Sequence, residues 1–88
     1  QSSSATYLVV MADESDAVVN HAMTVAKILR KKGGSVDVYL EDKKLAKKFD
    51  YADKLGIPNV VVIGEQEVEK NCFTVKEMKT GEQKVVKL

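Results

Sequence analysis

The stretch KKFDYADKLGIPNVVVIGEQE, residues 47–67, contains the end of a helix and the whole of a buried strand. Gly56 followed by Pro58 is typical of a helix that stops in a left-handed residue, because glycine adopts that conformation readily and proline cannot continue the helix. Residues 59–63 form a β-branched run, which is the pattern of a strand buried on both faces. This order of helix, stop and buried strand favours an α/β fold.

A helix is predicted before this strand. Leu45, Phe49 and Ala52 recur at i, i+4 and i+7, so we expect them to form its inward stripe. Asp42 is expected to cap the first turn, since its carboxylate accepts hydrogen bonds from free helix amides. Before the helix, the alternation VDVYL at residues 36–40 predicts a strand with Val, Val and Leu on one face.

The N-terminal third also predicts a strand followed by a helix that ends at glycine. Residues 6–11 are an apolar run that predicts another strand buried on both faces. Acidic residues at positions 13, 14 and 16 suit the positive end of a helix, and the glycines at 33–34 suit its stop. The expected inward stripe of this helix is Val18, Ala22, Val25 and Leu29. Two strand–helix–strand crossovers in succession predict three parallel strands.

The last third predicts a hairpin. Phe73 and Val75 alternate with polar residues, residues 79–82 form a turn, and a second strand returns through Val85 and Val86. A hairpin would extend the parallel core to five strands. Two helices cover a sheet of that size incompletely, so we expect some apolar surface to stay bare.

Composition restricts the class of protein. With 88 residues, 44% apolar and 31% charged, the chain has the size and make-up of one globular domain. Its net charge of +1 argues against nucleic-acid binding through bulk charge, so an RNA site has to be a local patch. The longest apolar run, residues 7–12, is far shorter than the roughly 20 residues of a membrane span. The single cysteine excludes an internal disulfide and fits a reducing, cytoplasmic location.

The residues that carry enzyme chemistry are few. His21 is the only histidine, and its place beside an apolar helix stripe favours a structural role. Cys72 opens a predicted strand and is most simply a buried filler. No spacing matches a metal site, and the acidic turn at residues 12–15 would repel a phosphate. We therefore expect no catalytic site, no metal and no cofactor in this domain.

The predicted second helix carries a basic arc. Lys44, Lys47, Lys48 and Tyr51 fall within one sector beside the core stripe. A basic arc with one aromatic suits an RNA backbone with an unstacked base. An ordinary solvated surface has the same pattern, so composition and spacing leave both interpretations open.

The sequence resembles the C-terminal anticodon-binding domain of histidyl-tRNA synthetase, in the class IIa aminoacyl-tRNA synthetase family. The likeness rests on KKFDYADKLGIP at residues 47–58 and VVVIGEQE at 60–67, followed by FTVK at 73–76 and TGEQ at 80–83. YADK before GIP and the turn GEQE indicate the histidyl branch. The threonyl, prolyl and glycyl enzymes share the fold but are less similar in these motifs.

The resemblance implies a mixed five-stranded sheet with strand order 2-1-3-4-5, strand 4 antiparallel, and helices on both faces, a three-layer architecture. The family adds a helix after the last strand, so that C-terminal helix is expected to be missing here. We interpret residues 6–88 as the anticodon-binding domain. Residues 1–5 are interpreted as linker or cloning residue.

The resemblance also implies a function. Such a domain holds the anticodon stem-loop of a tRNA, while a separate catalytic domain uses ATP and magnesium to charge the tRNA with histidine. The parent enzyme is implied to be a cytoplasmic homodimer. The RNA-binding residues implied by the resemblance are Asp42, Lys44, Lys47, Lys48, Glu65, Glu67 and Lys76, in addition to Tyr51 from the basic arc. The lysines of the helix would hold phosphates, and Glu67 and Lys76 would read base edges.

Two alternatives stay open at this point. One is a regulatory or interaction module that has the synthetase fold but no aminoacylation activity. The other is a free-standing α/β interaction domain with no RNA partner. Class II catalytic motifs in a longer parent sequence would indicate the ligase rather than a regulator.

Overall fold

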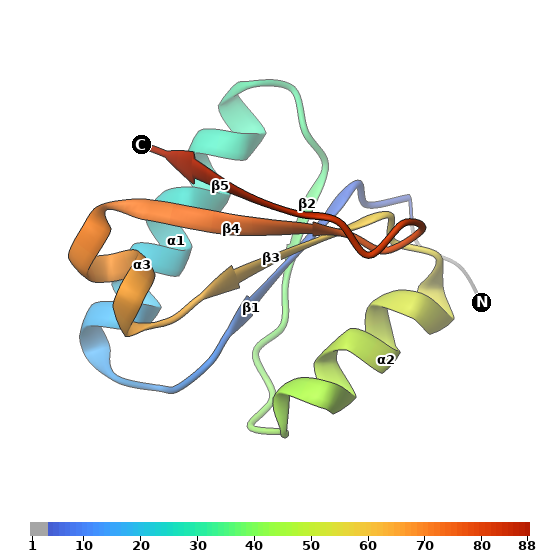
Figure 1. Cartoon of the computed structure of the whole chain (residues 1–88), viewed down its shortest axis with the longest axis horizontal. Coiled ribbons are helices and arrows are strands. Elements are labelled where there is room, and N and C mark those ends of the chain that lie inside the picture. The colour runs from blue at the N-terminus through green and yellow to red at the C-terminus, as the bar shows by residue number, and fades with distance from the viewer. Residues whose placement is uncertain (1–3) are drawn as a thin grey trace.

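The computed structural model describes residues 4–88. Its strands form one mixed sheet in the order β2-β1-β3-β4-β5 (Figure 1). These strands are β1 (Tyr7–Met11), β2 (Val36–Val38), β3 (Asn59–Ile63), β4 (Cys72–Glu77) and β5 (Gln83–Lys87). β1 pairs in parallel with β2 and β3, whereas β4 is antiparallel to β3 and β5. The expected α/β fold, strand order and antiparallel strand 4 are confirmed.

Helices cover both faces of the sheet. They are α1 (Asp16–Lys31), α2 (Leu45–Leu55) and α3 (Glu65–Lys70). The inward side chains of α1 share a buried cluster with Val9 and Val61, and Val68 of α3 packs against it. Ala52 of α2 belongs to a second cluster with Val10 on the opposite face, because successive strand residues point to opposite sides. The result is the three-layer arrangement that was expected.

Two local predictions are confirmed. The stripe of α1 is buried as expected, and the Ser15 hydroxyl caps the helix by accepting a hydrogen bond from the Val18 amide at 3.3 Å. α2 stops at Gly56, whose φ of 71° is left-handed. A residue with a Cβ is strained in that conformation, so glycine is the natural choice there.

The start and rotation of α2 differ from the prediction. The N-cap is Lys44, and the Asp42 side chain does not cap the helix, because residues 41–43 form a separate turn closed by the Lys43 amide and the Glu41 carbonyl. The inward face is centred on Lys48 and Ala52. Leu45 is 37% exposed at the edge of that face. Ala52 and Phe49 of the predicted stripe do pack in the cluster under α2, and Lys48 joins them as a buried residue that the pattern did not include.

β2 is shorter than predicted. The strand ends at Val38, and Leu40 is 72% exposed rather than inward. Tyr39 is the buried residue instead, in the cluster under α2, and its amide donates to the Val9 carbonyl at 2.9 Å. The strand therefore ends two residues before the predicted limit, and Tyr39 faces α2 because it alternates with Val38.

The short helix α3 was not predicted. The motif GEQE at residues 64–67 was expected to be a turn, whereas residues 65–70 form a helix of fewer than two turns between β3 and β4. Asn71 ends the helix at a φ of 50°. α3 is therefore a third helix packed on the sheet, on the same face as α1, and Val68 makes the contact.

The ends of the chain bear on the expected domain limits. Residues 1–3 of the expected linker lie outside the described residues. Ala5 does not fit a linker, because it is buried in the cluster under α2. Bare apolar surface was expected, and Val85 of β5 is 66% exposed on the α2 side of the sheet. Between residues 4 and 88, no helix has the length and apolar character that crossing a bilayer requires.

Candidate nucleic-acid interface

A groove of about 460 Å³ runs between α2 and the two last strands. We call it the β4–β5 groove; it is lined by Leu45, Phe49, Val62, Gln66, Glu67, Thr74, Lys76, Gln83 and Val85. The sheet register builds its floor, since Lys76 lies opposite Gln83 and Thr74 lies opposite Val85. The α2 wall is apolar, whereas the floor and the α3 wall carry polar groups. Such a mixture suits a ligand that has both a flat apolar face and a polar edge.

Lys76 is the cation of the β4–β5 groove. Its Nζ lies 4.8 Å from the centroid of the Phe49 ring, so the aromatic face holds the ammonium in place. A ring accepts no conventional hydrogen bond, so the N–H donors of Lys76 stay usable. Gln83 beside it adds an amide with both a donor and an acceptor. Groups of this kind read the edges of unpaired bases.

Both carboxylate oxygens of Glu67 accept hydrogen bonds from other residues of the domain. Oε1 accepts from the Gly64 amide at 2.8 Å, and Oε2 accepts from the Thr74 hydroxyl at 2.9 Å. The approach to Gly64 is close, because a Cβ there would lie 3.3 Å from Oε1. Glu67 therefore caps α3 and ties it to β4, which fixes one wall of the β4–β5 groove.

The residues of the basic arc predicted on α2 do not share one environment: one is buried and the other three are exposed. Lys48 is 5% exposed, and its Nζ donates to the Met11 carbonyl at 2.8 Å. The expectation that Lys48 projects from the helix surface is therefore wrong, and its ammonium is not presented to a phosphate. Lys44, Lys47 and Tyr51 are exposed as expected. The pattern failed at Lys48 because a long apolar stem allows a lysine to occupy a core-facing position when its ammonium finds a carbonyl.

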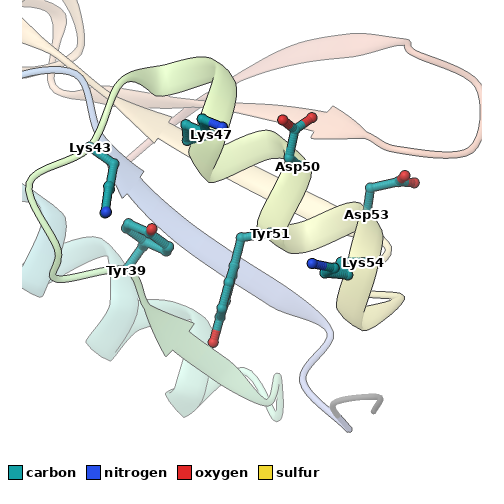
Figure 2. Close-up of a pocket in the computed structure, with 7 residues that line it drawn as sticks. All are labelled: Tyr39, Lys43, Lys47, Asp50, Tyr51, Asp53 and Lys54. Carbon is teal, nitrogen blue, oxygen red and sulfur yellow. The ribbon is translucent and has the colours of Figure 1, made fainter.

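A second groove, of about 590 Å³, lies on the β2 side of α2. We call it the tyrosine groove; its lining is Tyr39, Lys43, Lys47, Asp50, Tyr51, Asp53 and Lys54 (Figure 2). The two tyrosine rings meet edge to face with centroids 5.0 Å apart. Burial, the nearby Glu41 and Tyr51 raise the pKa of the Tyr39 phenol.

Asp42 meets a second acid outside both grooves. Its carboxylate lies within hydrogen-bonding reach of Glu14, and this contact with its negative charge raises the pKa of Glu14. The charge of Lys48 partly offsets that rise. A carboxylate pair repels a phosphate, so an Asp42 contact with RNA would have to be made to a base N–H or ribose hydroxyl donor and not to the backbone phosphate.

Comparison with known proteins identifies the family of this domain. The anticodon binding domain family matches residues 6–88, which is nearly the whole chain. The chain belongs to the anticodon binding domain family. This domain is 48% identical over 71 residues to the histidine–tRNA ligase of Aquifex aeolicus (strain VF5), a match that covers 81% of the chain and 18% of the ligase. The chain thus spans about a fifth of the curated relatives' length.

Solved structures give the same result for the fold. The domain superposes on the histidyl-tRNA synthetase of Nostoc sp. PCC 7120 with a TM-score of 0.85 and 32% identity, covering 97% of the domain and 19% of that chain. A prolyl-tRNA synthetase of Cryptosporidium parvum reaches a TM-score of 0.89 over 94% of the domain and 18% of that chain, at 15% identity. The second likeness shows a shared fold only.

The domain uses its histidine and cysteine structurally. His21 Nε2 lies 2.8 Å from the Cys72 carbonyl oxygen, so α1 is fastened to the start of β4. Cys72 is buried, as expected for a filler. Among residues 4–88, no cluster of three or more histidine, cysteine, aspartate or glutamate side chains could hold a metal ion.

Of the predicted site residues, Glu67 and Lys76 come together in the β4–β5 groove, and Lys47 and Tyr51 come together in the tyrosine groove. Glu65 lines neither groove. The sequence reasoning missed Gln83, because an isolated glutamine in a hairpin strand carries no signal by itself. Its place opposite Lys76 follows from the hairpin register, which the turn at 79–82 determines.

Proposed function

We propose that the domain binds the anticodon stem-loop of a histidine tRNA. The observation that carries the proposal is the β4–β5 groove, where Lys76 and Gln83 present paired polar groups beside the ring of Phe49. An unpaired base can place its edge on these polar groups, while the Phe49 ring holds the Lys76 ammonium in position. Membership of the anticodon binding domain family supports the proposal.

The proposed contacts have two kinds of chemistry. Lys44 and Lys47 are exposed at the start of α2, with Lys47 in the tyrosine groove, and would hold backbone phosphates as point charges. Lys76 and Gln83 would read base edges in the groove, since they offer directional donors and an acceptor. Glu67 would act mainly by holding α3 and Thr74 in position, because both of its oxygens already accept protein hydrogen bonds.

We further propose the role of a histidine–tRNA ligase for the parent of this domain. The relatives that support it are named histidine–tRNA ligases and are about five times longer than the matched segment. Charging of tRNA with histidine, with ATP and magnesium, would belong to a separate catalytic domain, in a cytoplasmic homodimer. Residues of this domain would contribute tRNA recognition alone.

Calorimetric titration with short RNAs tests the proposal. The ligands are the anticodon stem-loop of histidine tRNA and stem-loops with one anticodon base replaced, all at one salt concentration. We expect the histidine stem-loop to bind, and a replaced base to cost about 1–3 kcal/mol where a good base contact is lost. Equal affinity for all stem-loops would overturn base reading. Absence of binding to any of them would overturn RNA recognition and favour a protein-interaction module.

A further inference from the structure

The tyrosine groove and the β4–β5 groove lie on opposite flanks of α2. Successive helix residues are rotated by about 100°. Phe49, which lines the β4–β5 groove, and Lys47, which lines the tyrosine groove, are therefore about 160° apart around the helix. A single base cannot occupy both grooves, because the body of α2 separates them.

The tyrosine groove has one ring available for stacking. Tyr39 is almost fully buried, and the Lys48 ammonium already lies 5.8 Å from the centroid of its ring. Tyr51 is 40% exposed. Tyr39 meets it edge to face, so the buried ring supports the exposed one from the side. Tyr51 is thus a braced aromatic platform at the surface.

The charges around that platform are sorted by sign. Figure 2 shows the ammonium of Lys54 directed toward Tyr51 and that of Lys43 directed toward Tyr39, whereas the carboxylates of Asp50 and Asp53 point away from the two rings. The side of the rings that faces Lys43 and Lys54 is therefore cationic, whereas the acids Asp37 and Glu41 line a separate hollow on which the two tyrosines also border. An aromatic platform between ammonium groups matches a base with its adjoining phosphates.

We propose that the tyrosine groove is a second nucleotide subsite, which stacks one unpaired base of the anticodon loop on Tyr51 and holds an adjoining phosphate with Lys43 or Lys54. The inference rests on the proposed function, because the same RNA would place its anticodon bases in the β4–β5 groove. The nucleotide stacked on Tyr51 lies outside the anticodon, because the anticodon bases would occupy the β4–β5 groove on the other flank of α2. Stacking is sequence-tolerant, so this subsite adds affinity without reading a base.

Binding of the histidine stem-loop to Tyr51→Ala, measured by calorimetry beside the native domain, tests the proposal. We expect the affinity to fall about five- to 150-fold, as for loss of one stacked base, with the same loss for stem-loops of substituted anticodon. Tyr51→Phe keeps the ring and is expected to bind within about twofold of native. The double variant Lys43→Gln/Lys54→Gln is expected to weaken binding and its salt dependence, whereas Lys32→Gln, at the end of α1, changes neither.

Abasic replacements locate the nucleotide. Each loop position outside the anticodon is made abasic in turn, and each RNA is titrated into the native domain and Tyr51→Ala. At one position the two losses are expected to be non-additive, because both changes remove the same stack. Additive losses at every position would overturn the subsite even if the native domain discriminates anticodons. If Tyr51→Ala loses affinity because it unfolds, its melting temperature will be lower than that of the native domain. In that case the double variant Lys43→Gln/Lys54→Gln tests the subsite. Unchanged RNA affinity and unchanged salt dependence in this variant would overturn it.

Discussion

Lys47 and Lys48 are neighbours in sequence with opposite environments. Lys47 is exposed in the tyrosine groove, whereas the ammonium of Lys48 is buried against the Met11 carbonyl. This hydrogen bond joins α2 to the end of β1, because Met11 is the last residue of that strand. A buried carbonyl that loses its donor costs free energy, while an exposed lysine contributes mainly charge.

Substitution of these two lysines by methionine separates the roles. Lys48→Met is expected to lower the free energy of unfolding by about 1–3 kcal/mol, since it leaves the Met11 carbonyl unpaired. Lys47→Met is expected to change stability by no more than about 0.5 kcal/mol. In RNA titrations over a range of salt, Lys47→Met should reduce the slope of log affinity against log salt by up to about one unit. The same reduction in Lys48→Met would show that its ammonium meets a phosphate after all.

The pair Glu14 and Asp42 makes stability depend on pH. Asp42 raises the pKa of Glu14, so the folded state binds a proton at Glu14 more tightly than the unfolded chain does. The stability that this proton supplies is present in acid and is lost as the pH rises through the raised pKa. At neutral pH the two carboxylates repel each other.

Glu14→Gln is expected to remove the repulsion and keep a hydrogen-bond donor to Asp42. Its melting temperature should exceed that of the native domain at pH 7, and the difference should disappear at about pH 4, where native Glu14 is protonated. Glu69→Gln, on the exposed side of α3, serves as the control and should show no such crossover. Parallel melting curves of native and Glu14→Gln domains across this range would contradict the pairing.

Among the elements, α3 depends on a side-chain cap. Six residues form too short a helix to be stable alone, so Glu67 and the packing of Val68 hold it. Glu67→Ala is expected to destabilise the domain by about 0.5–2 kcal/mol. Hydrogen exchange of the Gly64 amide should accelerate, because its acceptor is lost. Glu69→Ala should leave that amide protected; equal exchange in both variants would mean that Glu67 does not cap α3.

Elements with an unambiguous apolar period were predictable from the sequence. The stripe of α1, the buried run of β3 and the stop at Gly56 each depend on local rules, and the structure keeps all of them. The rotation of α2 was not predictable, because the buried ammonium of Lys48 needs a carbonyl that lies 37 residues away. α3 was not predicted for a related reason: it depends on a tertiary contact. Glu67 accepts a hydrogen bond from Thr74, which belongs to the next strand.

The site was predictable in part. Glu67 and Lys76 were assigned through the family resemblance and do share the β4–β5 groove. Gln83 and the tyrosine groove required tertiary structure. Alternation along residues 36–39 places Tyr39 on the α2 face, opposite Val36 and Val38, but its contact with Tyr51 depends on where α2 packs.

For the whole molecule, the proposed binding surface coincides with the part of the sheet that the helices leave uncovered. β1 and β3 are buried between helices, whereas β4 and β5 keep part of their α2 side open, where Val85 is exposed. The centre of the sheet is thus buried, and the bases of the proposed RNA ligand would bind at the open edge formed by β4 and β5. α2 divides this edge from the tyrosine groove, so one RNA loop can contact the domain on both flanks of a single helix.

The central claim is that the β4–β5 groove reads the anticodon, and a double-mutant cycle between Lys76→Gln and each anticodon base tests it most directly. Affinities are measured for the native domain, Lys76→Gln and the phosphate-site control Lys47→Gln, each with the histidine stem-loop and its single-base replacements. We predict that Lys76→Gln abolishes discrimination at one or more anticodon positions, with a coupling of about 1–3 kcal/mol, while Lys47→Gln weakens all stem-loops alike. An unchanged ratio of native to replaced anticodon affinities in Lys76→Gln, at every position, would contradict the claim.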